Sequence, residues 1–131
     1  MDTEPTKPLI LVVDGSLQFA MILQFFFEQR GNFRAEIATS GASAIEKTLS
    51  LLPDLVFIYT IIPPPNGWEC CKLLKQIPEV QHIPIVVYGA LPNEEHQRQT
   101  MEVSALGCFV IPLRIEELID RIQQIIASAQ R

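Results

Sequence analysis

Short, continuous apolar runs alternate along the chain with longer segments in which apolar residues recur every three or four positions. Continuous runs are typical of strands covered on both faces of a sheet, whereas the wider spacing predicts one-sided helices. The predicted strands cover residues 9–13, 33–38, 55–62, 85–88 and 108–111. The predicted helices cover about 17–30, 42–51, 68–76, 93–103 and 115–129.

Local signals mark the ends of several of these elements. Ser16 is a suitable N-cap for the first helix, and Gly31 is a suitable residue to end it. Asn93 can cap the helix that precedes the last strand. The last helix has a one-sided apolar stripe at positions 115, 118, 119, 122, 125 and 126.

Strands that alternate with helices predict an α/β fold with a parallel sheet, in a three-layer αβα sandwich. We expect a flavodoxin-like (βα)5 arrangement, in which a five-stranded sheet has the order 2-1-3-4-5. Ligands of such folds bind in the crevice where strands 1 and 3 end. Asp14 and Tyr59 follow or end these two strands, so we expect both at that crevice.

Size and composition favour one folded domain. The chain has 131 residues, of which 48% are apolar, enough for a single buried core. We expect residues 1–8 to form a flexible tail and residues 9–129 to form the domain. No apolar run approaches the roughly 18–20 residues of a membrane-spanning helix, and the polar start does not look like a secretory signal.

Charge and cysteine content narrow the function classes. The net charge is −5, and the ten Lys and Arg residues are scattered, which argues against nucleic-acid binding. Three cysteines, two of them adjacent, favour free thiols and a cytoplasmic location over a disulfide framework. His82 and His96 are far apart in sequence, and we expect no metal site.

Four segments together resemble the receiver domain of bacterial two-component response regulators, the CheY-like superfamily. They read ILVVDG at residues 10–15, PDLVFI followed by PPPNGWE within 53–69, HIPIVVYGA at 82–90, and a last strand ending in Ile-Pro at 111–112. The resemblance covers about residues 9–126, nearly the whole chain. It implies a receiver-like domain in a phosphorelay signalling pathway.

The resemblance also shows where this chain departs from the family pattern. Receivers carry two adjacent acids after the first strand, which hold magnesium together with a phosphoacceptor aspartate that ends the third strand. Here only the first acid is present, as Asp14. The other positions are Gly15 for the second acid, Tyr59 for the phosphoacceptor, Gly89 for the hydroxyl residue after the fourth strand, Ile111 for the lysine and Cys108 for the switch aromatic.

This pattern predicts a degenerate pseudo-receiver that is not an enzyme. A lone carboxylate should bind magnesium weakly or not at all, and no lysine or hydroxyl remains to neutralise a phosphoryl group. We expect the Tyr59 ring to fill the vacated pocket, with its hydroxyl bonded to Asp14 or to solvent. Tyr88 is interpreted as packing. Asp54 should lie at the opposite end of the strand, too far away to replace the acceptor.

The first helix carries a second apolar row. Its predicted core face is Phe19, Ile22, Leu23, Phe26 and Phe27. Leu17, Met21 and Phe25 then form an apolar row on the solvent side. Such an exposed row more often marks a protein interface than a chance arrangement of apolar residues. In receivers this helix docks the four-helix bundle of a histidine kinase or phosphotransfer protein. We therefore expect a helical partner or a second copy on this row; the alternative is that the tail or a neighbouring helix covers it.

Three functional hypotheses follow. The first is a phosphorylation-independent protein-interaction module of a two-component pathway, alone or fused to an output domain. The second is a receiver phosphorylated by a non-standard route. The third is a ligand-sensing or redox-sensing flavodoxin-like module, although Cys70 and Cys71, with Leu74, are better explained as buried packing on the third helix.

Overall fold

The computed structural model describes residues 6–89, 98, 107–110 and 114–129. Its strands are β1 (Leu9–Val13), β2 (Arg34–Ala38), β3 (Leu55–Tyr59), β4 (Ile85–Gly89) and β5 (Gly107–Val110). Its helices are α1 (Leu17–Arg30), α2 (Gly41–Leu51), α3 (Gly67–Lys75) and α5 (Ile115–Ala129). The bounds lie close to those predicted from the apolar pattern, and the helix predicted at 93–103 lies outside the described residues.

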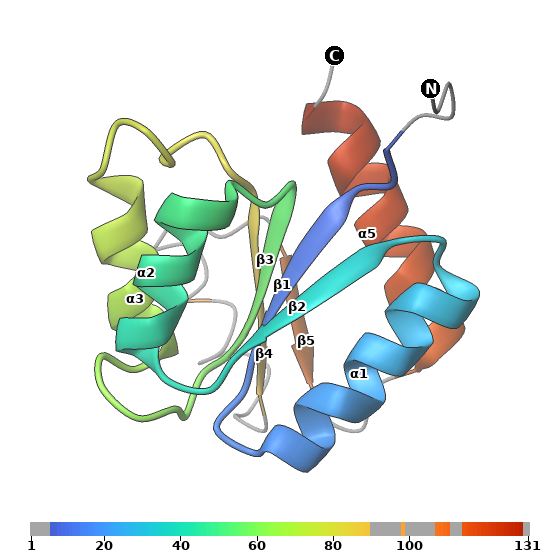
Figure 1. The fold of residues 1–131 in the computed structure, drawn as a ribbon, viewed down its shortest axis with the longest axis horizontal. Coiled ribbons are helices and arrows are strands. Elements are labelled where there is room, and N and C mark those ends of the chain that lie inside the picture. Colours follow the sequence, from blue (N-terminus) through green and yellow to red (C-terminus); the bar gives the residue numbers. More distant parts are fainter. Residues whose placement is uncertain (1–5, 90–97, 99–106, 111–113, 130–131) are drawn as a thin grey trace.

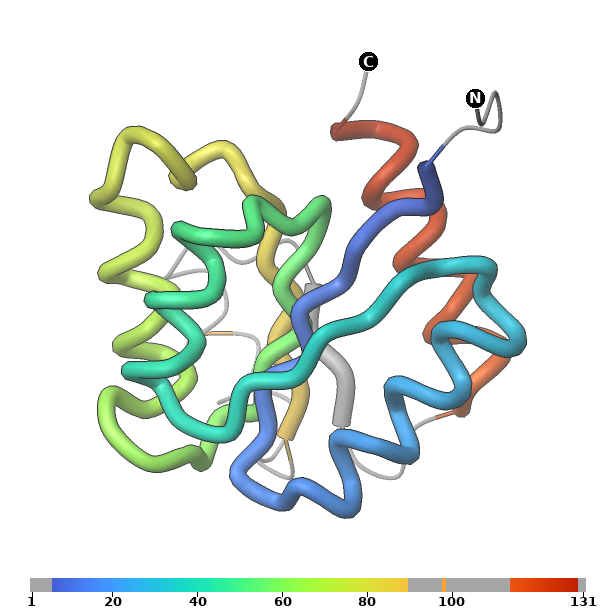
Figure 2. The backbone as a smooth tube through the Cα atoms, in the orientation of Figure 1, coloured from blue at the N-terminus to red at the C-terminus, as the bar shows by residue number. Residues whose placement is uncertain are grey.

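The strands form one parallel sheet in the order β2-β1-β3-β4-β5. Figure 1 shows α1 and α5 on one face of the sheet and α2 and α3 on the other. The predicted flavodoxin-like α/β fold, the parallel sheet and the order of the first four strands are therefore confirmed. In the backbone trace of Figure 2, the start of β1 and the end of α5 lie at the same end of the molecule.

Alternation along the strands divides the core into two layers. Ile10, Val12 and Phe57 belong to the layer beneath α1 and α5, whereas Leu11 and Val13 belong to the layer beneath α2 and α3. Successive strand side chains point to opposite faces, so a continuous apolar run supplies both layers at once. The stripe predicted on α5 faces the first layer, where Leu118, Ile119, Ile122 and Ile126 are buried.

The helix-end signals behave as predicted. The Ser16 hydroxyl accepts a hydrogen bond from the Phe19 amide at 3.2 Å, and Gly31 follows α1 with its amide donating to the Phe27 carbonyl. Of the predicted tail, the carbonyls of Lys7 and Pro8 accept hydrogen bonds from Arg34. No helix among the described residues is both long and apolar enough to cross a membrane.

The predicted core face of α1 was wrong in part. Ala20, Leu23 and Phe27 are the buried positions, whereas Ile22 is 51% exposed. At 3.6 residues per turn, Ile22 lies about 200° around the helix from Ala20. Because the small Ala20 side chain faces the sheet, Ile22 lies on the exposed side of the helix, as Met21 does.

The loop between β3 and α3 rests on the start of α2. The amide of Gly41 donates to the Pro63 carbonyl at 2.8 Å, and the amide of Ala42 donates to the Pro64 carbonyl at 3.3 Å. Gly41 has no room for a side chain, because a Cβ there would overlap the Pro65 carbonyl oxygen and lie 2.7 Å from its nitrogen. The proline-rich loop after Tyr59 is therefore held against α2.

Candidate functional site

Three polar or aromatic residues lie side by side at the carboxyl edge of the sheet. In the parallel register Val13 is opposite Ile58, and Tyr59 is opposite Tyr88. Asp14 therefore follows its strand at the level of both tyrosines. Side chains alternate along each strand, so these three positions continue the rows of the layer beneath α1 and α5. The predicted juxtaposition of Asp14 and Tyr59 is what this register produces.

Asp14 is held by two neutral donors. Its side chain is buried, with 5% of the residue surface exposed. The Tyr88 hydroxyl donates to Oδ2 at 2.6 Å, and the Ser16 amide donates to Oδ1 at 2.8 Å. The tyrosine that bonds Asp14 is thus Tyr88 rather than Tyr59, and the interpretation of Tyr88 as packing alone was incomplete.

Both the ring and the hydroxyl of Tyr88 are held in place. Its ring stacks on Phe57 with centroids 4.2 Å apart and an interplanar angle of 9°. Burial, followed by the hydrogen bond to Asp14 and the charge of that carboxylate, raises the pKa of the Tyr88 hydroxyl well above its ordinary value. The hydroxyl therefore stays protonated and remains a donor to Asp14 at physiological pH.

Tyr59 leaves part of the pocket open. The residue is half-buried and its ring tilts against Tyr88, with centroids 5.2 Å apart. Its hydroxyl makes no hydrogen bond within the described residues. A cavity of about 220 Å³ remains beside it, lined by Asp14, Ser16, Phe19 and Tyr59. The sequence led us to expect that the Tyr59 ring would fill this pocket, but the ring leaves the cavity open.

Gly89 lies at the end of β4 next to a residue that sequence reasoning missed. A Cβ at Gly89 would lie 2.6 Å from the Thr60 hydroxyl oxygen and 3.2 Å from its methyl carbon. Thr60 is buried, and its hydroxyl has no hydrogen-bond partner in the described part of the chain. The space beside Gly89 is thus taken by the side chain that follows Tyr59. The only sequence signal for this contact was the place of Thr60, a hydroxyl residue directly after the end of β3.

The remaining positions are less informative. Gly15 is exposed, and a Cβ there would meet only the Pro63 ring at 3.2 Å and the Thr39 carbonyl at 3.9 Å. Cys108 pairs with Val87 through the backbone of β5, and Ile111 lies outside the described residues. Asp54 accepts a hydrogen bond from the Leu9 amide at 2.8 Å, at the start of β1 and therefore at the opposite end from Asp14.

The resemblance to receiver domains implies a magnesium ion, and the oxygen ligands near Asp14 match one poorly. Magnesium prefers six oxygen ligands in near-octahedral geometry, commonly including one or two carboxylates. Here one carboxylate is present, and each of its oxygens already accepts a hydrogen bond. Over the described ranges, no group of three or more His, Cys, Asp or Glu side chains comes together around a common point.

The adjacent thiols of α3 are buried in the second core layer, as the sequence predicted. Cys70, Cys71 and Leu74 are all 1% exposed or less. Burial raises the pKa of Cys70 to about 11 and that of Cys71 to about 12. Thiols that remain protonated and covered are poor nucleophiles, so this pair does not favour redox sensing.

Replacing Cys108 with serine leaves Cys70 and Cys71 as the two thiols of the chain. We expect this variant to resist alkylation while it is folded. At pH 8 a thiol with a pKa of about 11 is roughly one part in a thousand thiolate, and the thiolate is the reactive form. Treatment with iodoacetamide, followed by intact mass, should give no adduct under native conditions and two adducts in urea. Native labelling at the rate of the unfolded chain would contradict this arrangement.

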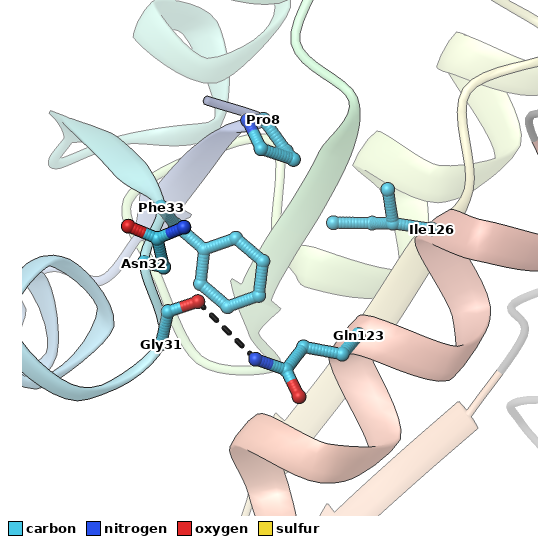
Figure 3. A pocket seen from close by; sticks show the side chains of 6 residues that line it. All are labelled: Pro8, Gly31, Asn32, Phe33, Gln123 and Ile126. Carbon is cyan, nitrogen blue, oxygen red and sulfur yellow. Dashed lines mark hydrogen bonds between the residues drawn. The ribbon is translucent and has the colours of Figure 1, made fainter. Parts of the chain in front are cut away.

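A second hollow lies at the other end of the sheet (Figure 3). It measures about 200 Å³ and is lined by Pro8, Gly31, Asn32, Phe33, Gln123 and Ile126. The Gln123 side-chain amide donates to the Gly31 carbonyl at 3.3 Å across its floor. The lining residues include no charged side chain. Pro8 directly precedes β1, so the hollow lies at the end of the sheet opposite Asp14.

Comparison with known proteins agrees with the architecture. The chain is 27% identical over 123 residues to the phosphate regulon transcriptional regulatory protein PhoB of Rhizobium meliloti, covering 94% of this chain and 54% of that protein. It is 30% identical over 129 residues to the transcriptional regulatory protein ResD of Bacillus subtilis, covering 98% and 51% respectively. The chain thus spans about half the length of these relatives.

A solved structure and a family model cover almost the whole chain. The signal receiver domain of a signal transduction histidine kinase from Syntrophus aciditrophicus superposes with a TM-score of 0.85 at 25% identity, over 95% of this chain and 93% of that one. The model of the response regulator receiver domain matches residues 10–123. Together with the parallel sheet and the position of Asp14 at its carboxyl edge, this match shows that the chain belongs to the response regulator receiver domain family.

Proposed function

We propose that this chain is a pseudo-receiver, a signalling module of a two-component type pathway that works without phosphorylation and through contacts with other proteins. The proposal assigns it no catalytic activity and no magnesium cofactor. The buried free thiols Cys70 and Cys71 fit the cytoplasmic location expected from the sequence.

The hydrogen bond from Tyr88 to Asp14 carries this proposal. A buried carboxylate needs partners, and in this site the partners are a neutral hydroxyl and a neutral amide instead of a cation. The Tyr88 ring is itself stacked on Phe57, so the hydroxyl cannot turn away without disturbing the core. Magnesium, which prefers six oxygen ligands, would find this single carboxylate with a donor already on each oxygen.

The acceptor position supports the same conclusion. Phosphoryl transfer depends on placing the nucleophile and on neutralising the charge of the transferring group. Tyr59 offers a phenol instead of a carboxylate as the nucleophile. The cavity beside it is lined by Asp14, Ser16 and Phe19, none of which carries a positive charge. An incoming phosphoryl group would face the Asp14 carboxylate with no positive charge in this lining.

Incubation with acetyl phosphate and magnesium should leave the intact mass of the chain unchanged. The reason is the missing acceptor and cation, so longer incubation and higher magnesium should make no difference. A receiver that has an acceptor aspartate serves as the positive control for the phosphodonor. A gain of one phosphoryl group that disappears in the Tyr59→Phe variant would overturn the proposal and favour a non-standard route of phosphorylation.

The apolar row on α1 is the surface that we propose for protein contacts. Leu17 is 55% exposed, Met21 53% and Phe25 58%, and Ile22 joins them at 51%. No charged residue lies between Leu17 and Phe25 in the sequence. An uncharged row at helical spacing fits the apolar face of a partner helix. Because the chain belongs to the receiver family, we propose that this helix comes from a histidine kinase or phosphotransfer protein. A second copy of this chain, or a fused output domain, is the alternative occupant.

Changing both Met21 and Phe25 to glutamate should abolish association with a cognate histidine kinase or phosphotransfer protein while the fold is kept. Both side chains are more than half exposed, so the charges cost little in the free chain but must be desolvated in a complex. Pull-down from the source cell and light scattering measure partner binding and self-association. The matched control changes Leu49 and Leu51, exposed apolar residues on α2, to glutamate. If all associations survive the α1 change, this surface is not the interface.

A further inference from the structure

The cavity beside Asp14 combines a buried negative charge with aromatic walls. Asp14 lines it together with Ser16, and the half-buried rings of Phe19 and Tyr59 form the rest of the lining. A third ring, Tyr88, stands behind them, with its centroid 6.2 Å from Phe19 and 5.2 Å from Tyr59. Aromatic faces carry negative electrostatic potential and attract cations, and a carboxylate adds a full charge.

The charge of Asp14 is not neutralised by any positive charge among the described residues. Its two hydrogen-bond donors, the Tyr88 hydroxyl and the Ser16 amide, are neutral, and it forms no ion pair in that part of the chain. A carboxylate has about four acceptor positions, so two remain after these bonds. A cation that entered the cavity would therefore find both a charge partner and a free hydrogen-bond acceptor.

An anion fits the same cavity poorly, although α1 begins beside it. The Ser16 amide is already used by Asp14, and the Phe19 amide is used by the Ser16 hydroxyl. A phosphate or carboxylate would meet Asp14 without a lysine, arginine or histidine in the lining. The amides that usually make a helix start attractive to anions are partly occupied.

We propose that this cavity binds a small ammonium group, primary or methylated. Asp14 supplies the charge and the acceptor, and Phe19 and Tyr59 supply the aromatic walls. The volume of about 220 Å³ is below the roughly 300–1,000 Å³ of sites for drug-sized ligands, which limits the occupant to a head group rather than a nucleotide or a large cofactor. Either a free organic amine or a lysine side chain of another protein carries such a group.

The test is an amide chemical-shift titration of the 131-residue chain with choline at constant ionic strength. Its uncharged isostere, 3,3-dimethylbutan-1-ol, serves as the matched ligand. Choline should give saturable shifts at Ser16, Phe19 and Tyr59, and the alcohol should not. Asp14→Asn should weaken choline binding by about tenfold, because the charge partner is lost. Tyr59→Leu should weaken it by about threefold, whereas Tyr59→Phe should keep it, because a ring face remains.

A trimethyllysine peptide distinguishes the two sources of the ammonium group. Binding that is tighter than that of choline indicates a protein side chain, and equal binding indicates a free amine; either result supports the site. Equal binding of choline and the alcohol, or no saturable shift, overturns the ammonium site and leaves the pseudo-receiver proposal standing. Magnesium that produces the same shifts and displaces choline overturns the pseudo-receiver proposal, which assigns no magnesium to this site, and leaves the ammonium site standing.

Discussion

Replacing Gly41 with alanine is expected to lower the free energy of unfolding by about 3 kcal/mol or more. A Cβ at this position would overlap the Pro65 carbonyl oxygen and lie within 2.8 Å of two more backbone atoms of that residue. Backbone atoms of a docked loop cannot turn aside as a side chain can. The loop would have to leave α2, and the hydrogen bond from the Gly41 amide to the Pro63 carbonyl would break. Urea unfolding, followed by circular dichroism, measures the loss.

Gly15→Ala is the control, because it adds the same methyl group next to another residue of the same loop. Its Cβ would meet the Pro63 ring carbon at 3.2 Å, a contact that a small ring adjustment relieves. Neither glycine has a positive φ, so neither substitution strains the backbone conformation. We expect Gly15→Ala to change stability by less than about 1 kcal/mol. Equal effects of the two substitutions would show that the proline-rich loop is not held against α2.

The sequence was sufficient for the fold because its signals are local. An apolar run such as 9–13 indicates a strand covered on both faces, and caps such as Ser16 need only their own helix to act. Repetition of strand and helix then leaves few parallel topologies. The position of Asp14 and Tyr59 at one edge follows from that topology, which is why this part of the site could be predicted.

What the sequence did not reveal depends on contacts between distant segments. The Tyr88–Asp14 hydrogen bond joins β4 to the residue that follows β1, and β3 lies between these two strands in the sheet. The exposure of Ile22 depends on the choice of Ala20 as the residue that faces the sheet. The crowding of Gly89 by Thr60 depends on how the chain turns after β3. None of these three features produces a periodic pattern in the sequence.

Changing Tyr88 to phenylalanine is expected to destabilise the protein by about 2 kcal/mol at pH 7. The variant keeps the stacked ring against Phe57 but leaves the buried Asp14 carboxylate without its 2.6 Å donor. Tyr59→Phe removes the equivalent oxygen, but the Tyr59 hydroxyl has no hydrogen-bond partner in the described part of the chain. We expect this variant to change the free energy of unfolding by no more than about 0.5 kcal/mol. Urea unfolding of the three proteins gives the comparison. Equal stability of the two variants would mean that the bond to Asp14 contributes little.

The same variant predicts how stability depends on alkaline pH. The folded-state pKa of Tyr88 is raised above its unfolded value of 10.0, so the contribution of Tyr88 is fully present below pH 10. Above that pH the unfolded chain loses this proton while the folded chain keeps it, and stability falls by about 1.4 kcal/mol per pH unit. Cys70 and Cys71 also have raised pKa values, but they are common to both proteins and cancel in the difference. The stability gap between the wild-type chain and Tyr88→Phe should therefore stay constant from pH 7 to 9 and shrink above pH 10. A gap that is unchanged at pH 11 would show that Tyr88 does not hold its proton against Asp14.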